Sequence, residues 1–243
     1  MNVLDQYYGD LDLTLFVACY NEEDNIIETL HTLLSALKTV DCSYDIIIID
    51  DGSTDNSVEL IRTFQQKNPD LPIILKVNKE NEGLAQNYIE AAFLGRGKYY
   101  RLICGDNVEP KETFVTIFKH LGESDMIIPY QVECPGRTFF RRLLSRVYTN
   151  LINFISGYSI KYYNGLAVHL RYNVMRWHTN YRGFGFQADM ITRLLDEDIQ
   201  YIEIPVVAKE REAGTSTALK MNNLFSVAHT LLDLSIRRIG RSF

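Results

Sequence analysis

The stretch from Ile46 to Ser57, IIIIDDGSTDNS, constrains the fold of this chain more than any other part of the sequence. Four β-branched residues in a row, with no polar residue between them, are typical of a strand buried on both faces, as in the middle of a parallel sheet. Asp50 and Asp51 then lie at the carboxyl end of this strand, the edge of an open α/β sheet where ligands bind. Asp55 is expected to cap the following helix, because aspartate is strongly favoured at that position. The stretch predicts an α/β fold with a ligand site beside Asp50 and Asp51.

Strands and helices alternate through most of the chain. Apolar runs predict further strands at Leu13–Cys19, Pro72–Val77, Tyr99–Cys104, Asp125–Pro129, Tyr162–Leu170 and Gln200–Val207. Segments with apolar residues at helical spacing lie between the first of these strands, and an amphipathic helix from Ala218 to about Ile239 closes the chain. This alternation predicts a Rossmann-like, mostly parallel central sheet with helices on both faces.

Length and charge exclude several classes of protein. A chain of 243 residues can bury the core of a single α/β domain, and nothing in the sequence marks a second one. The net charge of −6 argues against a nucleic-acid binder, because a phosphate backbone requires a basic surface. The four cysteines form no CxxC pair, and the sequence contains neither a signal peptide nor an apolar run of transmembrane length. We therefore expect a cytoplasmic protein without a zinc site or a disulfide framework.

Polar residues follow two more of the predicted strands. The tripeptide Tyr20-Asn21-Glu22 comes directly after the first strand, and Asp106 follows the fourth. The carboxyl ends of parallel strands share one edge of a sheet, so these residues are expected beside Asp50 and Asp51. The sequence thus predicts one cluster of acidic and amide side chains at that edge.

A helix predicted over Arg137–Ile155 separates basic from apolar residues. Arg137, Arg141, Arg142 and Arg146 lie opposite an apolar stripe. Such a helix can lie on an anionic membrane surface. It can equally pack in the core with a solvated basic face, since the stripe alone does not distinguish protein from lipid. The sequence leaves both interpretations open.

Three segments together resemble motifs of the family 2 inverting glycosyltransferases, which have the GT-A fold. They are VACYNEEDN at Val17–Asn25, IIDDGSTDNS at Ile48–Ser57 and NEGLAQNYIEAAFLGRGKY at Asn81–Tyr99. In this resemblance the first motif contacts the nucleotide of the donor, which assigns donor binding to Ala18, Tyr20, Asn21 and Glu22. Ala18 stands where the family usually has proline. The acids of the second motif, Asp50 and Asp51, are implied to hold the base and ribose.

The chain departs from the family at the metal motif. Where an Asp-x-Asp sequence is usual, this chain has Cys104-Gly105-Asp106. The resemblance implies that Asp106 binds Mg²⁺ or Mn²⁺ and takes part in catalysis. A thiolate at Cys104 is a poor ligand for such a hard ion. Loss of the first acid puts the strength of metal binding in question.

Within the family, the dolichyl- and polyprenyl-phosphate sugar synthases are the most similar group. Their arginine-rich segment resembles the region of Arg137, Arg141 and Arg142, which is implied to meet an acceptor phosphate. REAGTS at Arg211–Ser216 resembles a loop that closes on the donor, with Arg211 as its basic residue. GFGFQAD at Gly183–Asp189 resembles a helix start that carries Gln187 and Asp189 on the acceptor side.

The acceptor can be of two kinds. A hydroxyl must lose its proton during attack, and Asp189 is placed to be the general base for it. A phosphate is already an anion and needs arginines instead. Alternatively, Asp189 is only an acid in a first helical turn, where it favours the helix dipole.

The resemblance implies one GT-A domain over residues 1–243, with nucleotide-sugar binding in residues 1–130 and acceptor binding in residues 131–243. The expected reaction moves a sugar, with inversion and divalent-metal assistance, to a polyprenyl phosphate or a glycan in cell-envelope or polysaccharide synthesis. We expect a peripheral location on the inner face of the membrane. A nucleotidyltransferase would need a basic loop after the first strand, where this chain is acidic. A nucleotide-sugar-binding or membrane-scaffold protein that lost turnover is the alternative.

Overall fold

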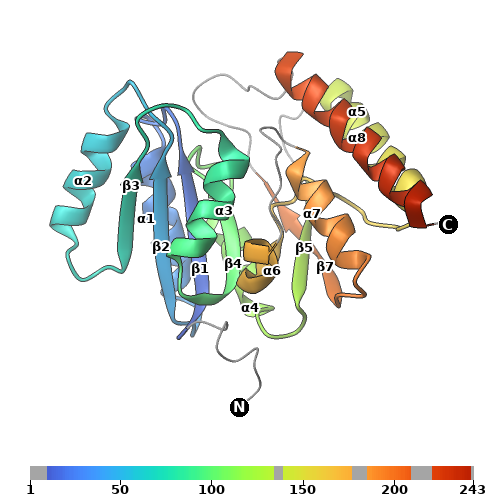
Figure 1. The fold of residues 1–243 in the computed structure, drawn as a ribbon. Coiled ribbons are helices and arrows are strands. Elements are labelled where there is room, and N and C mark those ends of the chain that lie inside the picture. Colours follow the sequence, from blue (N-terminus) through green and yellow to red (C-terminus); the bar gives the residue numbers. More distant parts are fainter. Residues whose placement is uncertain (1–9, 134–138, 177–184, 209–220, 242–243) are drawn as a thin grey trace.

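A computed structural model describes residues 10–133, 139–176, 185–208 and 221–241. Its strands form a seven-stranded sheet in the order β3-β2-β1-β4-β6-β5-β7 (Figure 1). The strands are β1 (Leu11–Cys19), β2 (Tyr44–Asp50), β3 (Ile73–Val77), β4 (Gly97–Cys104), β5 (Met126–Glu133), β6 (Val168–Leu170) and β7 (Tyr201–Val207). Neighbouring strands are parallel except where β6 pairs with β4 and with β5. The predicted mostly parallel sheet is confirmed.

Helices cover both faces of the sheet. They are α1 (Ile26–Leu37), α2 (Ser57–Lys67), α3 (Leu84–Leu94), α4 (Lys111–Lys119), α5 (Phe139–Ser156), α6 (Arg171–Arg176), α7 (Phe186–Leu195) and α8 (Met221–Arg241). One core cluster joins the sheet to α3 and α7, and a second joins it to α1, α2 and α4. This is the layered α/β arrangement that the alternation of elements predicts.

The isoleucines of β2 show why the sheet forms at its centre. Ile47 and Ile49 point into the first core cluster, and Ile46 and Ile48 point into the second. All four side chains are fully buried. Successive residues of a strand face opposite sides, so a strand covered by helices on both faces needs an uninterrupted apolar run.

Two local predictions were wrong. The strand expected over Tyr162–Leu170 is only the three-residue β6, because the chain turns before it. Leu166 has a left-handed φ of 45°, and a Cβ on Gly165 would lie 1.8 Å from the Pro129 carbonyl oxygen. Extended backbone therefore cannot begin until after this turn.

Asp55 is not the N-cap residue of α2, although it lies one residue before that position and contacts the first turn. That helix begins at Ser57 after Asn56, without a side-chain capping hydrogen bond. Asp55 instead accepts hydrogen bonds from the backbone N–H groups of Ser57 and Glu23, both at 3.0 Å. Its carboxylate links the loop after β1 to the start of α2.

The α5 and α8 helices contact one another along one side of the domain (Figure 1). The chain enters α5 after β5 and enters α8 after β7, and both strands run parallel to β4 through their shared partners. The helix pair is thus reached from the carboxyl edge of the sheet. Among the described helices, none combines the length and apolar character needed to cross a bilayer.

Candidate active site

Three strands bring the predicted donor-binding residues to one edge. The β1 strand pairs with β2 on one side and with β4 on the other, and Cys19 lies opposite Asp50 while Ala18 lies opposite Cys104. Tyr20, which follows β1, is about half exposed, at 49%. The structure therefore places the ends of β1, β2 and β4 side by side, as the sequence predicts.

Asp50 and Asp51 are both buried, and each carboxylate holds part of the local backbone. Asp50 accepts hydrogen bonds from Ser53 through the backbone N–H (2.9 Å) and the hydroxyl (2.5 Å). Asp51 accepts hydrogen bonds from the backbone N–H groups of Glu82 (2.8 Å) and Gly83 (3.0 Å), and from the Asn78 amide (3.0 Å). These contacts fix the turn after β2 and the loop that leads into α3. The two acids shape the walls of the candidate site.

The loop after β1 is fastened to the loop after β2. Asn21 has a left-handed φ of 54°, its N–H donates to Ser53 Oγ (2.9 Å), and its Oδ1 accepts from the Thr54 N–H (2.8 Å). The N–H of Glu22 donates to Ser57 Oγ (2.9 Å). Asparagine tolerates the left-handed conformation better than other side chains. The Tyr20–Glu22 tripeptide is thereby held at the carboxyl edge.

Gly105 sets the spacing between β1 and the exit of β4. Its N–H donates to the Ala18 carbonyl (2.9 Å), and its own carbonyl accepts from Thr29 Oγ1 (3.0 Å). A Cβ at this position would lie 2.8 Å from the Ala18 oxygen. Only glycine allows this close approach, which places Asp106 next to the first loop.

The protonation of the Cys104 thiol and the carboxylate of Asp106 determine which metal ligands this edge can offer. Both residues are half-buried. Burial raises the pKa of the Cys104 thiol well above its usual value, and the neighbouring Asp106 carboxylate raises it further. Without a bound ion the thiol is therefore protonated, and a thiolate would be a poor ligand for a hard ion, so Asp106 is the residue of the motif whose oxygens suit Mg²⁺ or Mn²⁺.

A metal ion at this edge would need oxygens from a ligand as well as from the protein. Among the described residues there is no group of three or more His, Cys, Asp or Glu that could hold an ion. Mg²⁺ is often bound through one or two carboxylates together with substrate phosphates. A single carboxylate at Asp106 fits an ion that is shared with a diphosphate.

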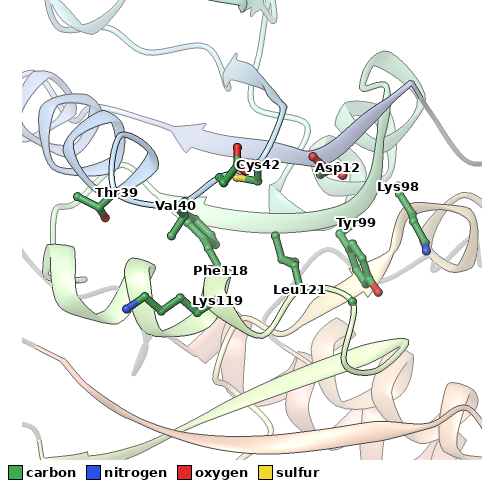
Figure 2. Close-up of a pocket in the computed structure, with 11 residues that line it drawn as sticks. Asp12, Thr39, Val40, Cys42, Lys98, Tyr99, Phe118, Lys119 and Leu121 are labelled. Carbon is green, nitrogen blue, oxygen red and sulfur yellow. The ribbon is translucent and has the colours of Figure 1, made fainter.

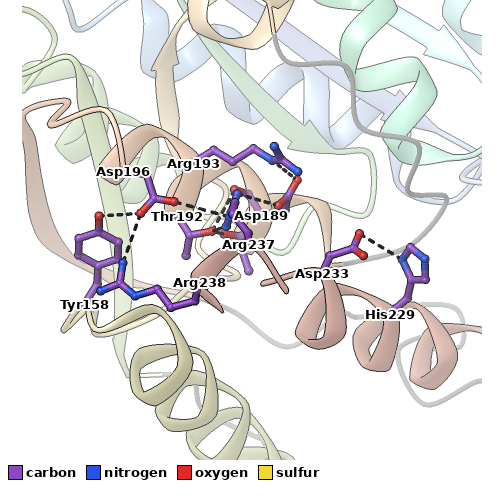
Figure 3. Close-up of polar contacts among 10 residues, drawn as sticks. Tyr158, Asp189, Thr192, Arg193, Asp196, His229, Asp233, Arg237 and Arg238 are labelled. Carbon is purple, nitrogen blue, oxygen red and sulfur yellow. Dashed lines mark hydrogen bonds and ion pairs between the residues drawn. The ribbon is translucent and has the colours of Figure 1, made fainter. Parts of the chain in front are cut away.

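Asp189, which the sequence predicts on the acceptor side, is buried and already contacts two arginines. Its Oδ2 accepts from Arg193 Nε (2.8 Å), and its Oδ1 accepts from an Arg237 Nη1 on α8 (3.3 Å), as Figure 3 shows. Neither arginine was predicted from the sequence as a partner of Asp189. Arg193 carried a signal, because its i, i+4 spacing from Asp189 is that of helical ion pairs. Arg237 lies 48 residues away and carried none.

Gln187 belongs to a buried polar cluster with Tyr88 and His169. All three side chains are at least 97% buried, at exposures of 3%, 0% and 0%. Burial lowers the pKa of His169 to about 4, and the nearby Gln187 amide opposes this shift, although neither ring nitrogen of His169 has a hydrogen-bond partner among the described residues. Burial also raises the pKa of the Tyr88 hydroxyl, and the same amide opposes part of this rise. His169 is thus a neutral residue of the core.

The predicted arginines divide into two groups. Arg137 and Arg211 lie outside the described residues. Arg141 is half-buried and Arg142 is exposed, both in the first turns of α5. The structure therefore places two of the four arginines on the helix that leaves the carboxyl edge.

Most of the apolar stripe of α5 faces solvent, although Ile152 is buried in the core and Tyr148 and Ile155 pack against it. Its exposed members are Phe139, Phe140, Leu143, Leu144, Val147, Leu151 and Phe154, and Phe154 is 86% exposed. On α8, Leu232, Ile236 and Ile239 are each more than 60% exposed. A monomeric soluble protein rarely exposes so much contiguous apolar surface without a binding role. Core packing of the whole α5 stripe is excluded.

A pocket of about 470 Å³ lies at the opposite edge of the sheet (Figure 2). Asp12 and Lys98 line it from the starts of β1 and β4, and Lys119 lines it from α4. Ligands of open α/β sheets bind at the carboxyl edge. This pocket is therefore not the candidate active site.

Comparison with protein families matches residues 14–182 to glycosyl transferase family 2. An undecaprenyl-phosphate 4-deoxy-4-formamido-L-arabinose transferase of Edwardsiella ictaluri is 25% identical over 232 residues, which cover 87% of this chain and 65% of that protein. A dolichyl-phosphate β-glucosyltransferase of Dictyostelium discoideum is 30% identical over 118 residues, which cover 46% of this chain and 35% of that protein. The chain spans just under two thirds of the first of these relatives.

Solved structures show the same fold at low sequence identity. Glucosyl-3-phosphoglycerate synthase of Mycobacterium tuberculosis with Mg²⁺ and UDP has a TM-score of 0.66 and 18% identity, and covers 93% of this chain and 80% of that chain. The same enzyme with Mn²⁺, UDP and phosphoglyceric acid has a TM-score of 0.68 and 14% identity, and covers 93% and 79%. Both structures are GT-A glycosyltransferases, which confirms the expected fold.

Proposed function

This chain belongs to glycosyl transferase family 2, and on that premise we propose that it moves a sugar from a nucleotide-sugar donor to a polyprenyl phosphate at a membrane surface. The observation that carries the proposal is the placement of two features at one edge. The ends of β1, β2 and β4 carry the donor motifs, and the exposed apolar helices α5 and α8 are entered from the same side of the sheet.

We infer that the donor nucleotide binds between the loops after β1 and β2. Ala18, Tyr20, Asn21 and Glu22 would line one side, and the turn built by Asp50 and Asp51 would line the other. Because both acids are buried, this wall is expected to be rigid, so little conformational entropy would be lost when the donor binds. Arg211 is proposed as a further donor contact, by resemblance alone.

Asp106 is the proposed metal ligand. A bound Mg²⁺ or Mn²⁺ would neutralise the charge that develops on the leaving diphosphate. The protonated thiol of Cys104 supplies no second anion, so Asp106 and the donor phosphates would share the ion. This arrangement predicts that metal affinity is low without nucleotide.

A phosphate acceptor suits the acceptor side better than a hydroxyl. An oxygen of the acceptor phosphate would attack the anomeric carbon from the face opposite the diphosphate, and the electron pair of the breaking bond would leave with the diphosphate. Inversion follows. Asp189 would be the general base only for a hydroxyl, and its two oxygens already accept from Arg193 and Arg237. Arg137, Arg141, Arg142 and Gln187 remain the proposed acceptor contacts.

The lipid part of the acceptor explains the apolar face of α5 and α8. A long isoprenoid chain stays in the bilayer, so the enzyme must approach its phosphate from the membrane surface. Exposed aromatic and aliphatic side chains next to Arg142 and Arg146 form an amphipathic surface of the kind that binds anionic lipid. Peripheral membrane attachment through this face is part of the proposal.

The alternative is a protein of the same fold that binds nucleotide sugars without turnover. The single carboxylate of the metal motif is the observation that favours it. A panel of UDP-, GDP- and dTDP-sugars, each tested with and without Mn²⁺, separates the cases by thermal stabilisation followed by product analysis. Mn²⁺-dependent stabilisation with transfer to undecaprenyl phosphate supports the enzyme. Stabilisation without transfer to any acceptor supports the alternative, and no stabilisation by any sugar contradicts both.

A further inference from the structure

One arginine fixes α8 to α7. Arg237 Nη2 donates to Thr192 Oγ1 (2.6 Å), Nη1 lies 3.3 Å from Asp189 Oδ1, and Nε lies 3.6 Å from Asp196 Oδ2. These partners lie at successive turns on one side of α7 and just after its end. A single guanidinium therefore contacts this side of the helix from its first turn to its C-terminal end. Asp189 and Thr192 are each only 1% exposed. Charge-assisted hydrogen bonds are strong at such desolvated positions.

Neighbouring contacts leave little freedom around this arginine. A Cβ on Gly185, just before α7, would lie 1.9 Å from Thr230 Oγ1 of α8. The Tyr158 hydroxyl donates to Asp196 Oδ1 (2.9 Å), and Arg238 Nη1 lies 3.8 Å from the same oxygen. Figure 3 shows Arg237 between Asp189 and Asp196, at the centre of this network. The network joins α7, α8 and the chain after α5.

The α8 helix therefore has one face that packs against α7 and an opposite apolar face that is exposed. Thr230, Leu234 and Arg237 face inward, with Leu234 in the core beside α7. Leu232, Ile236 and Ile239 face outward and are 62%, 66% and 62% exposed. A rigid helix with these faces can transmit a displacement of its outer side directly to α7.

We propose that Arg237 is a positioning residue that sets the orientation of α7, and thus of Gln187 and Asp189, relative to the apolar face of α5 and α8. The effect of Arg237 on catalysis rests on the proposed function. The phosphate of a lipid acceptor is held at the bilayer surface, so it can reach α7 only if that helix stays at a fixed height above the lipid. The clamp of Arg237 on Asp189, Thr192 and Asp196 provides this fixed place.

Hydrogen–deuterium exchange of the α7 peptide in solution tests the clamp without any ligand. Arg237→Gln should raise exchange in α7 about tenfold while exchange in α1 stays at the wild-type rate, because only the contact with α8 is lost. Arg237→Lys keeps the charge and should recover part of the protection. Asp233→Asn is the matched control, since it removes an exposed ion pair with His229 on the same helix (Figure 3).

Two outcomes would overturn the proposal. One is wild-type α7 exchange in Arg237→Gln, and the other is an equal rise in α1 and α7, which shows a loss of global stability only. If Arg237→Gln does not fold, Thr192→Val removes one acceptor of the same guanidinium and should raise α7 exchange to a smaller degree. Unchanged exchange in that variant would count against the clamp.

Vesicles of phosphatidylglycerol and phosphatidylcholine extend the test to the membrane. Wild-type protein should gain protection in α7 on binding, and Arg237→Gln should still bind but gain none. Its kcat for transfer to undecaprenyl phosphate should fall at least about tenfold with the nucleotide-sugar KM unchanged. Failure of wild-type protein to bind vesicles would contradict the proposed membrane function, whereas binding with an unchanged α7 response in Arg237→Gln would contradict the role of Arg237.

Discussion

Asp51 illustrates how a buried carboxylate can build a ligand-binding loop. It accepts two backbone N–H groups and one side-chain amide from the segment between β3 and α3. The carboxylate is 6% exposed, so water does not replace these contacts easily. Its neighbour Asp50 does the same for the turn at Ser53. Their contribution to donor binding is therefore expected to be mainly through the shape of these loops.

Replacement of Asp51 by Asn tests this role. An amide cannot accept from both Glu82 and Gly83 and also receive the Asn78 amide, so one buried donor is left unsatisfied. The free energy of unfolding should fall by about 1–3 kcal/mol in urea titrations. Asp24→Asn, at an exposed position of the loop after β1, should change it by less than about 0.5 kcal/mol. Equal effects of the two variants would show that the Asp51 contacts carry no special weight.

Asp106 is the residue proposed to bind the metal ion. Asp106→Ala should abolish the Mn²⁺-dependent share of nucleotide affinity in calorimetry, because no second carboxylate belongs to the motif. Cys104→Asp should tighten metal binding by adding an anionic oxygen beside Asp106. Unchanged Mn²⁺-dependent binding in Asp106→Ala would contradict the assignment.

The lowered pKa of His169 predicts that the folded protein loses stability in acid. Its pKa is lowered by burial from 6.5 to about 4 in the folded protein, so the unfolded chain takes up a proton first as the pH falls. Stability is full above pH 6.5 and declines toward pH 4, with a loss of about 2 kcal/mol at pH 5 from this group. His169→Leu should flatten this dependence in urea titrations at pH 7 and pH 5. An unchanged slope would show that His169 does not titrate in this range.

Helices and strands that follow from a local sequence pattern could be predicted, whereas features that depend on contacts between distant residues could not. The central strand β2 was predictable because each isoleucine has its own buried face. The residues before β6 were not, because a close approach to Pro129 and a left-handed Leu166 impose a turn on an otherwise strand-like sequence. The donor loops followed from strand order, whereas the contact of Arg237 with Asp189 depends on tertiary packing.

The α5 helix shows the same limit, since its stripe fits a core or a surface equally well in sequence. The structure leaves most of the stripe exposed, and we expect Phe154→Ser to weaken binding to phosphatidylglycerol vesicles about tenfold, because a large apolar side chain loses its burial in lipid. Phe93→Ser on α3 is the matched control, at 57% exposure away from this face. Co-sedimentation at low and high salt measures both variants, and equal effects would mean that α5 is not the docking surface.

For the whole molecule, charge and apolar surface are segregated. The chain has a net charge of −6, yet arginines line the exposed apolar face of α5. Such segregation orients a protein on an anionic surface, with attraction that weakens as salt rises. It would turn the carboxyl edge, with its donor loops, toward the lipid while the pocket at the amino edge points away.

The central claim, sugar transfer to a lipid phosphate, is tested most directly by the product. Protein, Mn²⁺, the nucleotide sugar that stabilises it and undecaprenyl phosphate in anionic vesicles should yield a glycosyl phospholipid that mass spectrometry detects. Asp189→Asn should lower this activity no more than Arg237→Gln, which disturbs the same contact, while replacement of Arg141 and Arg142 by Gln should lower it at least about tenfold. Transfer only to hydroxyl acceptors, lost in Asp189→Asn, would contradict the account.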